Sequence, residues 1–147
     1  MKIHSEQEML NFGRDFIHNL KPDQNLIELI GDVGAGKTTF TRGLADGLGI
    51  KESITSPSFT ISKTYALPTG GNLIHYDFYR LSDPGLMLDD LTESLSDPTN
   101  IVIVEWADTI KNFLPENRLK IEITYTDNNE REVIIKNPTD TKIKESI

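Results

Sequence analysis

Cysteine is absent from the 147-residue sequence. Without it the chain can form no disulfide framework, no thiolate metal site and no cysteine nucleophile. The sequence also has no long apolar run: the dense run at 101–104 is far shorter than the roughly 18 residues that a membrane helix needs. The first six residues have neither the apolar stretch nor the cleavage site of a signal peptide. We therefore expect a cytoplasmic protein without membrane association.

Basic residues are in short supply, because 15 Lys and Arg face 23 Asp and Glu and leave a formal net charge of −8. This balance argues against non-specific binding to nucleic acid or anionic lipid, although it leaves room for one concentrated positive pocket. With 37% hydrophobic and 26% charged residues, the composition is that of an ordinary globular domain. We expect one domain over 1–147, with a frayed tail from about residue 138.

Apolar periodicity predicts alternating helices and strands followed by a hairpin. Ser5 and Glu8 form a capping box that opens a helix of about four turns, ending before Pro22. Two further helices are predicted around 40–48 and after Pro84. Strands are predicted at 25–30, 61–67, 72–79, 100–104, 118–125 and 131–136, the last two as an antiparallel hairpin. This order favours an α/β layered domain with a mixed sheet.

The strongest motif is the glycine-rich segment 31–38, Gly-Asp-Val-Gly-Ala-Gly-Lys-Thr, which matches G-x-x-x-x-G-K-[ST] in full. Glycines let the backbone turn so that successive amide groups point at phosphate oxygens, and Lys37 adds a positive charge. Thr38 offers a hydroxyl to Mg²⁺, and the following helix contributes its positive N-terminal end. An apolar strand before the motif and an amphipathic helix after it support a P-loop. The predicted nucleotide-binding residues are Asp32, Val33, Gly34, Ala35, Gly36, Lys37, Thr38 and Thr39.

A P-loop needs an acidic residue on its metal side, at the end of a nearby strand. Glu105 follows the apolar run 101–104, and Asp77 ends the alternating run that starts at Leu73. Which of the two contacts the metal stays open. Trp106, the sole tryptophan, is either a core residue or a cover over the site. The sequence has no N-K-x-D element, which favours adenine over guanine as the base.

Several other residues form weaker candidates, each with an ordinary structural alternative. His75 shares a strand face with Asp77, and Arg80 could supply charge to the transition state or contact a partner. Hydroxyls around Pro57 suit a loop that closes on a γ-phosphate. The candidate switch or partner-facing residues are Ser56, Ser58, Thr60, His75, Arg80 and Trp106.

Four motifs in register resemble the TsaE (YjeE) family of ATPases, which are required for making threonylcarbamoyladenosine in tRNA. They are segments 31–40, 56–59, 75–80 and 105–106, with Val33 in place of the family's leucine and Ser58 in place of its threonine. The resemblance implies a small P-loop NTPase with three layers, a mixed, mainly parallel central sheet and a C-terminal antiparallel hairpin. It also implies slow ATP hydrolysis and docking on the TsaD and TsaB heterodimer, which nucleotide turnover would reset.

The resemblance further implies roles for individual residues. Thr38 and Glu105 would hold Mg²⁺, and Asp77 would act in hydrolysis. Glu6 and Arg131 would lie near the adenine. Together with the P-loop, this makes Lys37, Asp77 and Glu105 the expected catalytic residues, with ATP and Mg²⁺ as cofactors.

Two alternatives remain at the level of the sequence. One is a small nucleoside or nucleotide kinase, which also pairs a P-loop with an acid-aromatic-arginine segment, although no arginine-rich lid segment is visible. The other is a protein in which ATP is only a structural ligand that sets affinity for a partner. If the chain acts as the TsaE resemblance implies, its acidic charge predicts that tRNA is held by the partners and not by this chain.

Overall fold

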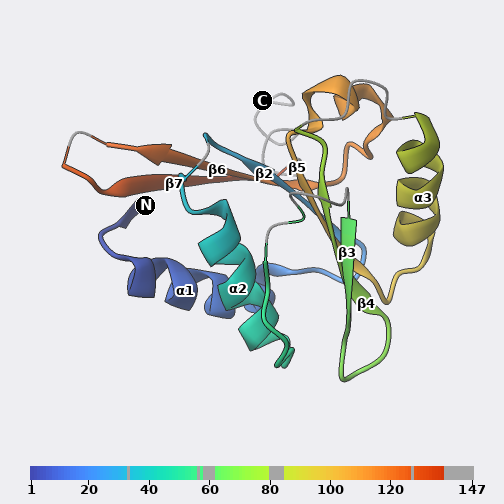
Figure 1. The fold of residues 1–147 in the computed structure, drawn as a ribbon, viewed down its shortest axis with the longest axis horizontal. Helices are drawn as coiled ribbons and strands as arrows, with labels where there is room; N and C mark the ends of the chain where they lie inside the picture. The colour runs from blue at the N-terminus through green and yellow to red at the C-terminus, as the bar shows by residue number, and fades with distance from the viewer. Residues whose placement is uncertain (33, 56, 58–61, 80–84, 127, 138–147) are drawn as a thin grey trace, which may run out of the picture.

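The computed structural model describes residues 1–32, 34–55, 57, 62–79, 85–126 and 128–137. Within these residues the backbone forms a seven-stranded sheet with helices on both faces (Figure 1). The strands are β1 (Lys2–Ile3), β2 (Leu26–Ile30), β3 (Ser62–Ala66), β4 (Asn72–Asp77), β5 (Ile101–Glu105), β6 (Leu119–Tyr125) and β7 (Arg131–Lys136). The helices are α1 (Glu6–Asp15), α2 (Lys37–Gly47) and α3 (Gly85–Ser96), with short 3₁₀ segments η1 (Phe16–Asn19), η2 (Ala107–Thr109) and η3 (Lys111–Phe113).

The sheet has the strand order β1-β7-β6-β2-β5-β4-β3. Its four central strands, β6, β2, β5 and β4, pair in parallel, whereas β7, β1 and β3 join through antiparallel pairs. The prediction of a mixed sheet with a mainly parallel centre and a C-terminal hairpin is confirmed. Because the central strands run in the same direction, their carboxyl ends meet at one edge of the sheet, where α/β proteins bind ligands.

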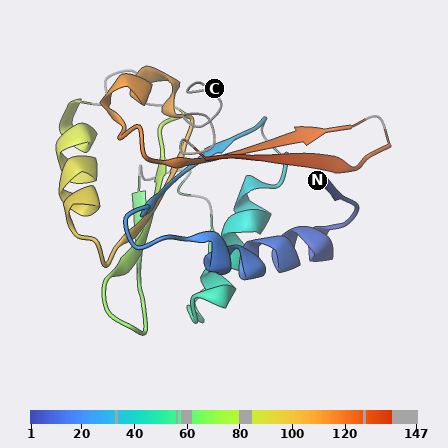
Figure 2. The ribbon, with the colours of Figure 1, turned by 180° about the vertical axis from the view of Figure 1, so that it is seen from behind.

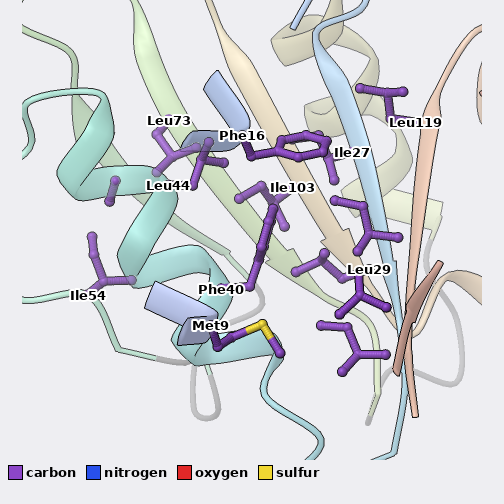
Figure 3. Close-up of a cluster of buried hydrophobic side chains, with 14 of the residues drawn as sticks. Met9, Phe16, Ile27, Leu29, Phe40, Leu44, Ile54, Leu73, Ile103 and Leu119 are labelled. Atoms are coloured by element: carbon purple, nitrogen blue, oxygen red, sulfur yellow. The ribbon is translucent and has the colours of Figure 1, made fainter. Parts of the chain in front are cut away.

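Helices α1 and α2 cover one face of the sheet, and α3 with η2 and η3 covers the other (Figures 1 and 2). Strand β2 is therefore buried on both faces: Leu26 packs toward α3, while Ile27 and Leu29 pack toward α2. Figure 3 shows the larger core, in which Phe40 of α2 lies against the sheet. Two apolar layers therefore enclose β2 and β5 and fix the strand ends that carry the site.

Helices α1 and α2 cross with their backbones in contact. A methyl group at Gly43 would lie 2.2 Å from the Leu10 carbonyl oxygen, and one at Gly13 would lie 2.4 Å from the carbonyl oxygen of Phe40. Only glycine permits this approach. It places the side chain of Met9 beneath the P-loop, where a methyl group at Gly36 would lie 3.1 Å from Met9 Cε.

Two local features differ from the sequence-based prediction. The first helix ends at Asp15 and continues as η1, because the Phe16 amide shares its hydrogen bond between the carbonyls of Phe12 and Gly13 and the last turn tightens. Strand β1 was not predicted, since two residues are too few for an alternating pattern and its pairing with β7 comes from the tertiary fold.

Among the described helices, none is both long enough and apolar enough to cross a bilayer. The predicted frayed tail lies outside the described residues.

Candidate functional site

The P-loop connects the end of β2 to the start of α2. Gly34 and Gly36 have φ angles of +82° and +118°, in the left-handed region that favours glycine. The first helical hydrogen bond runs from the Phe40 amide to the Gly36 carbonyl. The amides of Lys37, Thr38 and Thr39 therefore have no acceptor within the helix, as is usual for a first turn, and form a natural anion site.

The other nucleotide-binding residues predicted in the P-loop differ in their surroundings. The Ala35 amide donates to the Asp32 carbonyl at 3.0 Å, so it closes the turn in this conformation. The Asp32 and Gly34 residues are exposed at the mouth of the loop. Val33 lies outside the described residues.

Lys37 is the first residue of α2 and is buried, with 6% of its surface exposed. Its ammonium donates to the Gly31 carbonyl at 2.6 Å and lies 3.5 Å from Glu105 Oε1. It also lies 4.1 Å from the centre of the Trp106 ring. The positive charge that the sequence predicted is therefore held directly beside the acid at the end of β5.

Glu105 is also buried, and its second oxygen, Oε2, accepts a hydrogen bond from His75 Nε2. Burial alone would raise the pKa of Glu105. The hydrogen bond from His75 and the nearby positive charge of Lys37 outweigh that effect and lower the pKa. Glu105 is therefore held as a carboxylate, the form that binds a divalent cation.

Asp77 lies directly opposite Glu105 in the β4–β5 pairing and is half-buried. Burial raises the pKa of Asp77, the Tyr79 amide that donates to its carboxylate at 2.9 Å acts against this, and the charge of Glu105 raises it further. The two acids thus sit side by side with pKa values displaced in opposite directions. Such a pair suits one carboxylate for binding charge and the other for exchanging a proton.

Trp106 covers this group of charges. Its backbone has a φ of +56°, which is unusual for a residue other than glycine, and turns the chain immediately after Glu105. The indole lies over the Lys37 ammonium and its ring centre is 4.7 Å from that of Tyr79, which is 55% exposed. Of the two interpretations of Trp106, the geometry favours the cover over the site.

The β6–β7 hairpin reaches the other side of the P-loop. The Tyr125 hydroxyl donates to the Gly34 carbonyl, and Arg131 Nε donates to the Ala35 carbonyl at 3.2 Å. The Arg131 guanidinium also lies 4.1 Å from the centre of the Tyr125 ring. Tyr125 was missed by the sequence analysis. The predicted hairpin could have indicated Tyr125, because it places this residue opposite Arg131.

Glu6 is the first residue of α1, three residues before Met9. Its carboxylate is exposed and lies 3.8 Å from Arg42 of α2. Arg42 donates in turn to the Ile54 carbonyl at 3.4 Å. Among the described contacts, Glu6 therefore meets α2 and not the phosphate-binding turn itself.

His75 requires a correction. We predicted a switch or partner-facing residue. The side chain is fully buried, which contradicts a partner-facing position, because β4 is an inner strand between β3 and β5 and its residues 73–76 are buried. The other switch or partner-facing candidates Ser56, Ser58, Thr60 and Arg80 lie outside the described residues.

A pocket of about 380 Å³ opens beside these side chains. Its lining includes Asp32, Ala35, Lys37, Trp106, Asp108 and Tyr125. This volume is in the range of small-molecule sites. The lining joins the P-loop to the cover residue Trp106 and to the hairpin.

The donor set fits magnesium bound together with a nucleotide. Glu105 would offer an anionic oxygen, and Thr38 would offer a hydroxyl from the first turn of α2. In the described parts of the chain, no group of three or more His, Cys, Asp or Glu side chains is arranged to hold a metal. Mg²⁺ usually keeps water and phosphate ligands and takes only one or two from the protein, so two oxygen donors beside a P-loop are the appropriate set.

Comparisons with known proteins point in one direction. Residues 3–133 match the family model described as threonylcarbamoyl adenosine biosynthesis protein TsaE. The chain is 35% identical over 136 residues to the TsaE protein of Rickettsia typhi, covering 91% of this chain and 92% of that one. It is 43% identical over 114 residues to the TsaE protein of Bacillus subtilis, covering 74% and 67%.

A solved structure is also similar. The crystal structure of Bacillus subtilis YdiB aligns with a TM-score of 0.76 and 32% sequence identity, covering 96% of this chain and 86% of that chain. The similarity therefore extends over the described sheet and both helical layers.

Proposed function

The chain belongs to the TsaE family of threonylcarbamoyl adenosine biosynthesis proteins, and we propose that it serves this pathway as a magnesium-dependent ATPase. ATP would bind at the P-loop with its phosphates at the start of α2. The observation that carries the proposal is the buried Lys37 ammonium, held between the Gly31 carbonyl and the ionised Glu105. A buried cation beside a carboxylate and free helix amides is the arrangement that a metal-bound triphosphate requires.

Each residue has a distinct part in this proposal. The amides of Lys37, Thr38 and Thr39 and the Lys37 ammonium would bind the terminal phosphates. Thr38 and Glu105 would hold Mg²⁺, which supplies charge neutralisation for the phosphates. Asp77 would orient the attacking water and accept its proton, because a carboxylate with a raised pKa is the better base near neutral pH.

Turnover by the protein alone should be slow. In the described part of the chain, Arg131 is engaged with the Ala35 carbonyl and Arg42 with Glu6 and the Ile54 carbonyl, so neither is bonded to the two acids. An arginine supplied by a partner adds about 10³ to 10⁵ in rate in other phosphoryl-transfer systems. This supports a model in which hydrolysis is completed on a partner.

The partner in our proposal is the heterodimer of TsaD and TsaB, which the family resemblance implies. Nucleotide binding and hydrolysis would reset that complex between cycles of tRNA modification. The net charge of −8 supports action through protein partners, because direct approach to tRNA would meet repulsion from every phosphate.

One set of assays tests the proposal. ATP hydrolysis should rise when the TsaB–TsaD heterodimer is added, and Lys37→Ala should lose both nucleotide binding and hydrolysis. Unchanged ATP affinity in Lys37→Ala would contradict the site. No stimulation by the heterodimer would contradict the partner, and a phosphorylated nucleoside among the products would favour a kinase instead.

A further inference from the structure

His75 is a fully buried side chain of the site, and the roles assigned to the P-loop and to the two acids give it no function. It lies on β4 opposite Ile103, two residues before Asp77, so its side chain points to the same face of the sheet as those of Asp77 and Glu105. Its Nε2 bonds to Oε2 of Glu105, and both side chains are buried. The hydrogen bond to Glu105 is thus the contact through which His75 reaches the site.

The hydrogen bond determines which oxygen of Glu105 remains available. Oε2 is engaged by His75, while Oε1 is the oxygen that faces Lys37 Nζ at 3.5 Å. An unsupported carboxylate can rotate about its last bond and exchange the two oxygens. With one oxygen tied to an inner strand, the other stays directed at the P-loop lysine.

The carboxylate of Glu105 sets the direction of this hydrogen bond. An ionised carboxylate only accepts hydrogen bonds, so Nε2 carries the hydrogen of this contact. Among the residues that the structure describes, the buried Nδ1 has no hydrogen-bond partner. Among these residues, Nε2 is therefore the ring nitrogen through which His75 bonds to the site.

We propose that His75 is a positioning residue: its Nε2–H holds the Glu105 carboxylate so that Oε1 is directed toward the metal of the bound nucleotide. The inference rests on the proposed function of the site. It assigns His75 a part in metal affinity and no direct contact with nucleotide, water or partner. Supporting residues of this kind typically change metal affinity by about 10-fold to 100-fold when they are replaced.

Two variants separate positioning from simple packing. His75→Gln keeps an N–H donor close to the position of Nε2, whereas His75→Met fills a similar volume without a donor. For each variant, ADP affinity without divalent metal is measured by calorimetry. The Mn²⁺ concentration that half-saturates the ADP complex is then measured by electron paramagnetic resonance, and thermal unfolding checks the fold.

We expect His75→Met to raise the half-saturating Mn²⁺ concentration by about 10-fold or more. Its metal-free ADP affinity should stay within about twofold of the wild type, and His75→Gln should remain within about threefold for Mn²⁺. Wild-type Mn²⁺ dependence in His75→Met would overturn the proposal, as would an equal loss of metal-free affinity, which is the sign of a structural role.

The remaining outcomes are also informative. If His75→Met does not fold, His75→Asn takes its place, since its amide is too short to reach Glu105, and the same result is expected. If the wild type binds no ADP with or without Mn²⁺, the proposed function itself fails. If the wild type binds metal and nucleotide and the variants show the same Mn²⁺ dependence as the wild type, only the role of His75 is wrong and the proposed function stands.

Discussion

At the scale of single residues, the two acids of the site differ in what surrounds them. Glu105 is buried but bonded to His75 and close to Lys37, so its pKa is lowered. Asp77 is half-buried, and burial together with the neighbouring carboxylate raises its pKa. Two carboxylates at the ends of adjacent strands are thus chemically distinct, although the sequence presents them as equals.

Asp77→Asn should separate hydrolysis from binding. The amide is almost the same shape but cannot accept a proton, so the partner-stimulated rate should fall by about 10²-fold to 10⁴-fold while ATP affinity stays within about twofold. The rate is measured by phosphate release and the affinity by calorimetry. Asp89→Asn, an exposed acid on α3, is the control. A variant with normal turnover would show that Asp77 is not the base.

Tyr76 allows a pH-dependent prediction away from the site. Its hydroxyl donates to Asp90 at 2.6 Å and contacts Ser94 at 2.8 Å. Burial and the Asp90 carboxylate raise its pKa well above the ordinary value near 10. The folded state therefore holds this proton more tightly than the unfolded state, so the stabilisation is complete below about pH 10 and is lost as the pH rises above it.

The free energy of unfolding should consequently fall by up to about 1.4 kcal/mol per pH unit above pH 10 on account of Tyr76. Urea unfolding at pH 8 and at pH 11 measures the loss. Tyr76→Phe should lose less stability between these two pH values than the wild type, whereas Tyr79→Phe, at an exposed position, should follow the wild type. Equal losses in the wild type and in Tyr76→Phe would contradict the assignment.

At the scale of elements, the crossing of α1 over α2 leaves no room for a larger side chain at Gly43. The Gly43 Cα lies so close to the Leu10 carbonyl that an added methyl group would stand 2.2 Å from its oxygen. Both partners are backbone, so no side chain can rotate away. Gly43→Ala must push the two helices apart, and with them Met9 and Gly36.

We therefore expect Gly43→Ala to lower the free energy of unfolding by about 3 kcal/mol, although alanine has the higher helix propensity. Urea unfolding monitored by circular dichroism measures the change. Asp46→Ala, which removes the exposed ion pair with Arg14 at the rim of the same crossing, should cost at most about 1 kcal/mol. A Gly43→Ala protein as stable as the wild type would show that the helices can separate freely.

At the scale of the whole molecule, the site is assembled from segments far apart in the chain. The P-loop follows β2, the acids end β4 and β5, and Tyr125 and Arg131 come from the hairpin. A ligand that bridges these segments should stabilise all of them together, because it binds only the folded state.

Mg²⁺ and ADP at about 100 times the dissociation constant should add about 2.7 kcal/mol to the free energy of unfolding. For a chain of this length, this raises the melting temperature by roughly 5 to 10 °C. Differential scanning calorimetry measures the shift, and Lys37→Ala should abolish it. A shift of the same size in Lys37→Ala would mean that the nucleotide binds elsewhere.

Features that depend on neighbours along the chain follow from the amino-acid sequence. The P-loop connects the end of β2 to the start of α2, so the conformations of Gly34 and Gly36 and the first-turn amides of α2 follow from local geometry. Glu105 and Asp77 each end a strand, which was sufficient to bring both to the same edge of the sheet.

Which distant segments meet depends on packing across the whole chain. The hydrogen bond from Tyr125 to Gly34 and the short strand β1 both require that the hairpin adjoin β2, and no local pattern encodes this. His75 became a buried partner of Glu105 only because β4 is flanked on both sides and pairs with β5 in one register. Periodicity reports the two faces of a strand, whereas burial depends on its neighbours in the sheet, which are chosen by packing across the whole chain.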